Sequence, residues 1–497
     1  MLASVNSAVL EGVDGRVVTV EVHVSRGLPG YTVVGLPDAA GRESRERVRA
    51  ALLSSGLEYP MKRVTVNLAP ASVRKAGSGL ELAVALALSS ADGGLPAGAL
   101  DGVGVFGELG LDGSVRPVPG TLALVDAIAR AGTECVIVPA ANAAEAHLVP
   151  GVHVYVARSL GELHACLKGE APWPDPPDPP PPLDTSDTDE PLDLLDVRGL
   201  ANARHALAAT AAGGHHLLLV GPPGVGKTML ARRLPTILPE LDRDAALEVT
   251  RIHSAAGLMT ISALQTRPPF RAPHHSASTV SLVGGGSPRV RPGEITLAHR
   301  GVLFLDEVAE FPTRVLEALR QPLEERTIRI SRASGTLEFP ADFLLVACAN
   351  PCPCGKVDKE CACSDLQRTR YARRLSAPLL DRFDLRLRIS TPSDEVGASS
   401  AEIRRRVEGA LLRQNARLAG TCWRRNAHIP AGALERLVPL SPDAHETWTE
   451  ECRLRRLTGR GAARIRRVAR TLADLDDRDA LTADDVARAS WLRQDVW

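Results

Sequence analysis

The segment HLLLVGPPGVGKTMLARRL (216–234) carries the strongest chemical signal in this 497-residue sequence. An apolar run at 216–220 predicts a strand, a glycine-rich loop follows, and Lys227 and Thr228 open a helix. Glycines let the backbone wrap closely around a phosphate, so that its N–H groups meet the negative charge. Lys227 would then reach the β- and γ-phosphates of ATP, and the Thr228 hydroxyl would ligate Mg²⁺. The loop residues expected to bind the nucleotide are Gly221, Pro222, Pro223, Gly224, Val225 and Gly226.

A second motif supplies the acidic residues that a phosphate loop needs to bind Mg²⁺ and to activate water. GVLFLDEV (301–308) predicts a buried strand that ends in two carboxylates. Asp306 is expected to complete the Mg²⁺ shell, and Glu307 to orient or deprotonate the attacking water. A solvated acidic pair at a strand end is the plain alternative, and the nearby phosphate loop argues against it.

The elements that must position these residues fall into separate regions. Residues 171–193 hold nine prolines and seven acids, so 170–193 is predicted to be an extended linker. Before it, alternating apolar strands and helical stretches predict an α/β domain over 1–169. After it, short β-branched runs precede glycine-rich turns and helices over 194–395, and the pattern is helical over 396–497.

Composition narrows the classes of function. Lys plus Arg and Asp plus Glu both number 59, but residues 401–470 hold sixteen arginines and only seven acids. Aromatic residues make up 3%, so base stacking on aromatic platforms is not expected to dominate nucleic-acid binding. No run of eighteen apolar residues and no secretory leader is present, so a cytoplasmic protein without membrane contact is expected.

Four of the nine cysteines, Cys352, Cys354, Cys361 and Cys363, form a four-cysteine cluster with the spacing C-x-C-x6-C-x-C. Four thiolates within twelve residues can close a tetrahedral zinc site and hold a loop in place. Two-residue gaps are the commoner zinc spacing, so unliganded thiols and a redox or disulfide pair remain alternatives. No catalytic zinc is indicated, because no open position with an adjacent base is evident.

Longer strings resemble one family of ATPases. The two motifs above, the strand FLLVACAN and the segment SAPLLDRFDL occur in the order found in AAA+ ATPases. The chain is similar to the YifB/ComM family, within the magnesium chelatase-like branch, and the likeness spans all three predicted domains. The strings that carry the likeness to this branch are FRAPHHSAS (270–278), LVGGG (282–286), RPGEITLAHRGVLFLDEVAEF (291–311) and ANPCPCG (349–355).

The resemblance implies further roles. Asn350 matches the sensor-1 position, which orients the lytic water or reads the γ-phosphate. Arg382 matches the arginine finger that reaches the ATP of a neighbouring subunit. Arg460 matches the sensor-2 arginine of a helical lid, with Arg464 as a close rival. An arginine finger acting in trans implies a ring, and the family implies a homo-hexamer.

The amino-terminal region resembles the Lon protease domain, also known as the ribosomal S5 domain 2-like fold. Lon chemistry needs a serine nucleophile and a lysine base, but the matching positions are Gly79 and Leu122. Ser78 and Lys75 leave a shifted dyad as an outside alternative. Residues 1–169 are therefore expected to keep a Lon-like fold for assembly or DNA handling, without peptidase activity.

The segment RTIRISRASGTLEFPADF predicts a β-hairpin around Ser334 and Gly335. Related AAA+ rings point a hairpin here into the pore, which makes Arg329 and Arg332 candidates for contacting DNA phosphates; an exposed, solubilising hairpin is the alternative. His274 and His275 are adjacent, which disfavours a shared metal and favours a structural or pore-lining role. Phosphate contacts of this kind would be independent of sequence and sensitive to salt.

The function indicated is an ATP-driven motor that moves branched or single-stranded DNA in recombination, as in natural transformation, with recombination proteins as candidate partners. The ATPase rests on residues, whereas the DNA client rests mainly on the resemblance and the arginine distribution. Three rivals remain: a metal-chelatase motor subunit, a Lon-like protease, and an ATPase that remodels a protein client.

Overall fold

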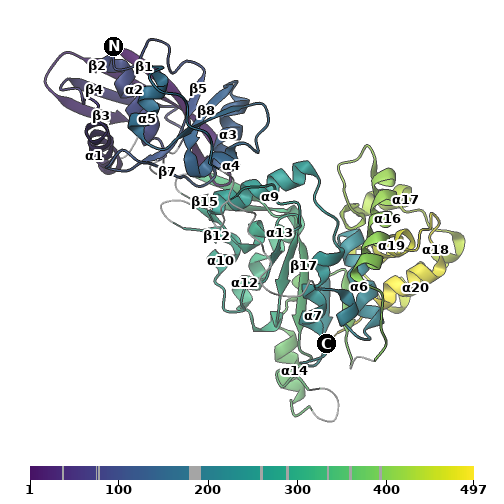
Figure 1. Cartoon of the computed structure of the whole chain (residues 1–497). Coiled ribbons are helices and arrows are strands. Elements are labelled where there is room, and N and C mark those ends of the chain that lie inside the picture. Colours follow the sequence, from purple (N-terminus) through teal and green to yellow (C-terminus); the bar gives the residue numbers. More distant parts are fainter. Residues whose placement is uncertain are drawn as a thin grey trace.

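The computed structural model describes residues 1–35, 38–73, 75, 79–177, 192–257, 261–286, 290–332, 335–356, 361–390 and 394–496. Ser78 and residues 178–191, which include most of the predicted linker, lie outside these ranges. Two α/β regions and a set of carboxyl-terminal helices follow one another along the chain (Figure 1). Within the described residues, no helix is long and apolar enough to cross a membrane.

The amino-terminal region is built on a mixed seven-stranded sheet in the order β3-β4-β2-β1-β5-β8-β9. Residues of β2 alternate between buried and more exposed, because successive side chains point to opposite faces of a sheet. The strands are β1 Leu2–Glu11, β2 Asp14–Ser25, β3 Gly30–Val34, β4 Arg63–Ala69, β5 Val103–Val105, β8 Cys135–Pro139 and β9 His153–Ala157. The helices are α1 Asp38–Ser54, α2 Glu81–Asp92, α3 Thr121–Arg130, α4 Ala143–Ala146 and α5 Leu160–Leu167.

The central region contains a parallel five-stranded sheet in the order β11-β14-β17-β10-β18. Its inner strands are almost entirely buried and read as continuous apolar runs, as expected for a parallel sheet covered on both faces. The strands are β10 Leu217–Val220, β11 Phe270–Arg271, β14 Val302–Leu305, β17 Leu344–Ala349 and β18 Leu385–Arg388. The longer helices around the sheet are α6 Ala201–Gly213, α7 Lys227–Arg232, α9 Arg243–Ala256, α12 Thr313–Ala318, α13 Arg320–Glu325 and α14 Asp365–Ala372.

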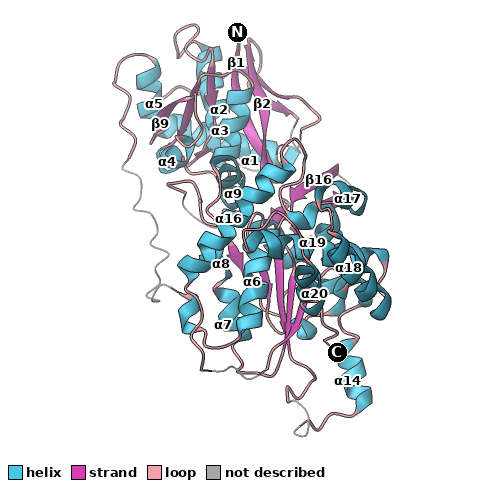
Figure 2. Cartoon of the chain, turned by 90° about the vertical axis from the view of Figure 1, so that its right-hand side faces the viewer, coloured by secondary structure: helices cyan, strands magenta, loops and turns pink. Residues whose placement is uncertain are grey.

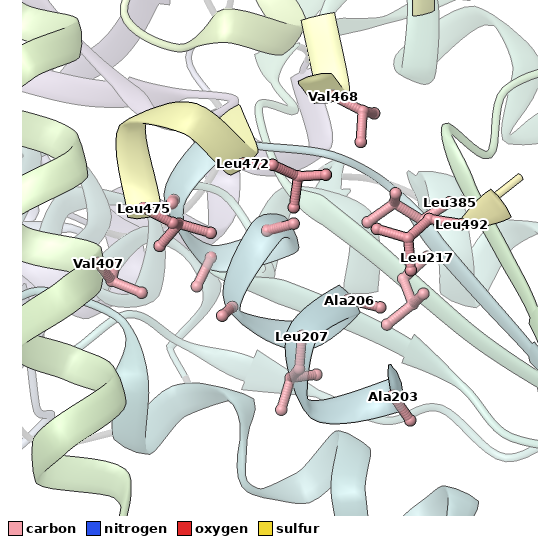
Figure 3. Packing of buried hydrophobic residues seen from close by; sticks show 14 of the residues in the cluster. Ala203, Ala206, Leu207, Leu217, Leu385, Val407, Val468, Leu472, Leu475 and Leu492 are labelled. Atoms are coloured by element: carbon pink, nitrogen blue, oxygen red, sulfur yellow. The ribbon is translucent and has the colours of Figure 1, made fainter. Parts of the chain in front are cut away.

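The carboxyl-terminal part is helical, and it shares a core with the central sheet. Its main helices are α16 Ser400–Leu418, α18 Pro442–Leu454, α19 Gly459–Leu475 and α20 Ala483–Trp491. Ser399 begins α16 with a capping box in which Glu402 returns a hydrogen bond. Figure 3 shows Leu472 of α19 beside α6, and Leu207 of α6 belongs to the same buried cluster. The helices are therefore attached through buried apolar side chains rather than by a linker alone.

The amino-terminal region packs on one end of the central region, beside α9 and the hairpin of β15 Thr327–Arg332 and β16 Gly335–Pro340 (Figures 1 and 2). Ser254 of α9 donates a hydrogen bond to the buried Glu145 carboxylate, and Arg251 lies 3.3 Å from Asp14. The turn at Gly12 lies against the Phe339 ring of β16. The two regions are thus joined by a specific polar and apolar interface.

Candidate functional site: a nucleotide site and a separate arginine cavity

The phosphate loop lies between β10 and α7, as the sequence predicts. Gly224 and Gly226 have φ values of +80° and +90°, a backbone region that glycine adopts at low cost. Gly221 is needed for another reason, because a Cβ there would lie 2.5 Å from the Ile389 carbonyl oxygen. The loop therefore folds tightly at the end of a buried strand and precedes the amino terminus of α7, which suits a phosphate.

Lys227 and Asn350 meet at this loop. Lys227 Nζ donates hydrogen bonds to the carbonyl oxygens of Gly221 at 2.6 Å and Pro222 at 2.8 Å, and to Asn350 Oδ1 at 3.2 Å. Burial lowers the pKa of the Lys227 ammonium, while the thiol of Cys348 and the carboxylates of Asp306 and Glu307 oppose that shift. Asn350 directly follows β17, which lies between β10 and β14, so the topology brings this predicted sensor residue beside the lysine.

Thr228 and Asp306 also lie together. Thr228 Oγ1 donates a hydrogen bond of 2.8 Å to Asp306 Oδ2, although 78 residues separate them. A hydroxyl and a carboxylate oxygen are ligands that Mg²⁺ accepts beside nucleotide phosphates. These two residues fit a magnesium ion, which would neutralise charge on the β- and γ-phosphates.

Glu307 follows Asp306 in a left-handed backbone conformation with φ of +48°. This conformation is unusual for a residue other than glycine, and such strain gathers at functional sites. The Glu307 side chain is exposed, and its Oε2 lies 3.6 Å from Nδ1 of His275. The His274 ring lies against the His275 ring, with centroids 4.0 Å apart and the planes tilted by 35°. The structure therefore places His275 beside the proposed base, where the sequence suggested a structural or pore-lining role.

We expect His275→Ala to lower the rate of ATP hydrolysis about fivefold with little change in the KM for ATP. The reason is that an exposed contact of this kind contributes up to about 1 kcal/mol, and His275 contacts Glu307 rather than the phosphate loop. Steady-state ATPase assays measure the effect. His153→Ala, an exposed histidine on β9 of the amino-terminal region, is the control. An unchanged rate in His275→Ala, or an equal loss in both variants, would contradict a role in holding Glu307.

Arg382 lies at the end of the central sheet where the strands begin, opposite to the end that holds the phosphate loop. It precedes β18, whereas Lys227, Asp306 and Asn350 follow their strands. Four strand residues span about 13 Å, so Arg382 cannot reach a phosphate held by the Lys227 of its own chain. Its guanidinium pairs with Glu324, and its Nε is buried without a hydrogen-bond partner among the described residues. Burial, and then the charges of Arg464, Arg460 and Arg320, lower the pKa of Arg382.

Arg382 lines a cavity of about 840 Å³ between the central sheet and the carboxyl-terminal helices. The residues that line it include His216 and Leu344, which lie at the starts of strands of the central sheet. Its lining includes six acids and seven arginines, the latter being Arg300, Arg326, Arg382, Arg424, Arg425, Arg464 and Arg467. We call this space the arginine cavity; its arginines exceed its acids by one, and Arg300, Arg382 and Arg464 are paired with carboxylates.

The two sensor-2 candidates occupy different environments near Arg382. Arg460 is exposed at the start of α19. Arg464 is buried one turn later, where it lies 2.8 Å from Asp381 and 2.9 Å from Asp384. Asp384 in turn accepts from His215 at 3.2 Å. Both candidates thus lie near Arg382, at the end of the central sheet away from Lys227. The sequence did not predict this placement.

The remaining predicted residues lie on the hairpin, in the amino-terminal region and in the four-cysteine cluster. Arg329 is exposed on β15 and pairs with Glu338 at 3.1 Å, whereas Arg332 has no acidic partner among the described residues. Leu122 is buried on α3, and Gly79 lies next to Val118, which precedes that helix. Lys75 is buried and donates to the Pro70 carbonyl oxygen. The four cysteine sulfurs lie within 4.8 Å of one another.

Comparisons with known proteins identify the family of this chain. Residues 193–396 match the family described as magnesium chelatase, subunit ChlI, residues 20–142 match subunit ChlI of Mg-chelatase, and residues 397–493 match the ChlI C-terminal family. The fold and the site thus define a magnesium chelatase-like AAA+ protein, and family membership implies ATPase activity with ATP and Mg²⁺.

The chain belongs to the YifB/ComM branch of this family. It is 41% identical to YifB of Escherichia coli and 39% identical to the competence protein ComM of Haemophilus influenzae. Each alignment covers 98% of this chain and 96% of the relative. An uncharacterized protein of Mycobacterium tuberculosis is 46% identical over 98% of both chains.

Proposed function

We propose that this protein is a ring-shaped ATPase that drives the migration of branched DNA during recombination of incoming strands. The observation that carries the ring is the separation of Arg382 from Lys227 across the central sheet. One chain holds a phosphate loop at one end of the strands of the central sheet and the arginine cavity at the other end. A complete catalytic site therefore needs two chains. The homo-hexamer remains an expectation from the family.

In this arrangement Glu307 of one chain activates water, while Arg382 of the next chain approaches the γ-phosphate. Positive charge at that point stabilises the negative charge that develops in phosphoryl transfer. Glu324 holds Arg382 before the subunits meet. Arg464 is held by Asp381 and Asp384, so we assign it a structural role in the arginine cavity. The exposed Arg460 is then the arginine that contacts the nucleotide.

The DNA client is supported by the hairpin and its surroundings. Ile330 of β15 lies beside Gly284, so the hairpin and the LVGGG loop, both candidates for a pore, lie side by side. Arg332 is the stronger candidate for a phosphate contact, because the Arg329 charge is offset by Glu338. The amino-terminal region packs on the same hairpin, which suits a Lon-like domain retained for DNA handling. The relative ComM is named a competence protein, which supports a role in the uptake and recombination of DNA.

A strand-exchange assay tests this function. Purified protein with ATP is expected to move a labelled three- or four-strand DNA junction, and Lys227→Ala is expected to abolish that movement. Binding should weaken steeply with salt if phosphates dominate the contacts. Normal ATP turnover that DNA neither stimulates nor couples to movement would contradict the DNA client. That result would favour a protein or tetrapyrrole client for the same ATPase.

A further inference from the structure

The four-cysteine cluster has the geometry of a site for a single metal ion. Cys352 Sγ lies 3.3 Å from that of Cys354 and 3.4 Å from that of Cys361, and the sulfurs of Cys354 and Cys361 are 3.6 Å apart. A tetrahedral site with Zn–S bonds of about 2.3 Å places its sulfurs about 3.8 Å apart. A disulfide would need about 2.0 Å, so these distances disfavour paired cysteines.

The ligand set also selects the metal. Four thiolates in a tetrahedral arrangement favour zinc or iron–sulfur chemistry over hard cations. All four sulfurs lie within 4.8 Å of one another, which leaves room for one ion and not for several irons with their bridging sulfides. Four thiolates around Zn²⁺ carry a net charge of minus two, and Arg368, which lies near Cys361, supplies a compensating positive charge.

The four-cysteine cluster touches the nucleotide site directly. Cys352 is 2% exposed and lies two residues after Asn350, which accepts the hydrogen bond from Lys227. The Gly355 N–H donates to the Cys352 carbonyl oxygen at 3.0 Å and closes a tight turn. Gly355 packs against Pro223 of the phosphate loop, since a Cβ added there would lie 3.0 Å from Pro223 Cδ.

The four-cysteine cluster also precedes a helix that has few neighbours. Ser364, directly after Cys363, begins α14 with a capping box that involves Gln367. Most of α14 is exposed, and it projects from the end of the molecule opposite the amino-terminal region (Figure 1). Tyr371 is the buried residue of α14, so apolar burial holds this part of the chain at one point, and a metal crosslink would add rigidity to the loop before the helix.

We propose that the four-cysteine cluster binds one structural zinc ion, and that this ion holds the Pro351–Gly355 wall of the nucleotide site against the phosphate loop. The ion supplies no catalytic step. Its contribution is to restrict the loop that follows Asn350, so that the carboxamide and Pro223 keep their positions when ATP binds. This inference extends the ATPase and is independent of the DNA client.

Metal analysis of the full-length protein tests the first part. Wild-type protein is expected to contain one zinc ion per chain, and the double variant Cys361→Ser/Cys363→Ser to contain none. Cys422→Ser, an exposed cysteine outside the four-cysteine cluster, is the matched control and should retain the ion. Protein reconstituted with Co²⁺ should show thiolate-to-cobalt charge-transfer absorption. No zinc, together with no such absorption, would overturn the metal site, as would a disulfide found by mass spectrometry.

Nucleotide binding without turnover tests the second part. Removal of the metal from wild-type protein with a thiol reagent and chelator should weaken binding of a fluorescent ADP analogue roughly fivefold, and reduction followed by added zinc should restore it. This arm does not depend on whether the double variant folds, which circular dichroism reports. Unchanged affinity after complete zinc loss would overturn the link to the phosphate loop. No DNA is present, so failure here is distinct from failure of the branch-migration proposal.

Discussion

Glu307→Gln is expected to reduce ATP hydrolysis by roughly 10²–10⁴-fold while leaving ATP binding nearly intact. The amide keeps the size and shape of the side chain but cannot accept a proton from water. Lys227, Thr228 and Asp306, which hold the phosphates and Mg²⁺, are unchanged by it. Single-turnover hydrolysis gives the rate, and a fluorescent ATP analogue gives the affinity.

Glu310→Gln is the matched control for this change. Glu310 lies three residues further along, is exposed, and pairs with Arg374 at 2.8 Å. Removal of its charge should alter the hydrolysis rate less than about twofold, because exposed ion pairs contribute little. Equal losses in the two variants would mean that general negative charge, rather than Glu307 as a base, matters. Full activity in Glu307→Gln would remove it from the mechanism.

Arg382→Ala is expected to lower hydrolysis by roughly 10³–10⁵-fold, again without loss of ATP binding by the same chain. Lysine should not restore the rate, because it lacks the planar, forked donors of a guanidinium. Arg320→Ala is the control: Arg320 lies near Arg382 but is 44% exposed and pairs with Glu317. It should retain most of the activity.

Mixing two inactive variants tests whether Arg382 acts between chains. Lys227→Ala lacks the phosphate contact and Arg382→Ala lacks the finger, so each is inactive alone. In a mixed ring, some interfaces pair an intact Lys227 with an intact Arg382 of the neighbour. The mixture should therefore recover part of the ATPase activity that neither variant has. No recovery, with mixed assembly shown by crosslinking, would place Arg382 in its own chain's site and contradict the ring.

Much of the nucleotide site could be predicted from the sequence, because its parts are contiguous. The phosphate loop, its strand and its helix occupy nineteen successive residues (216–234), and GVLFLDEV places both acids after a second strand. The alternating strands and helices expected over 1–169 are present, among them the strands β4, β8 and β9. Local signals of this kind depend on hydrophobic periodicity and on backbone freedom at glycine, which neighbouring residues determine.

Other features depend on contacts between distant segments, which periodicity does not encode. The separation of Arg382 from Lys227 follows from the parallel pairing of β10 with β18, because one residue precedes its strand and the other follows its strand. The preference for Arg464 over Arg460 as the anchored arginine follows from Asp381 and Asp384. The contact of His275 with Glu307 and the packing of Gly355 on Pro223 likewise join separate loops. The sequence by itself thus determined which chemical groups this protein carries and which of them are local neighbours. Only the tertiary structure decided which groups share a site and which face away, because strand order and helix packing set those distances.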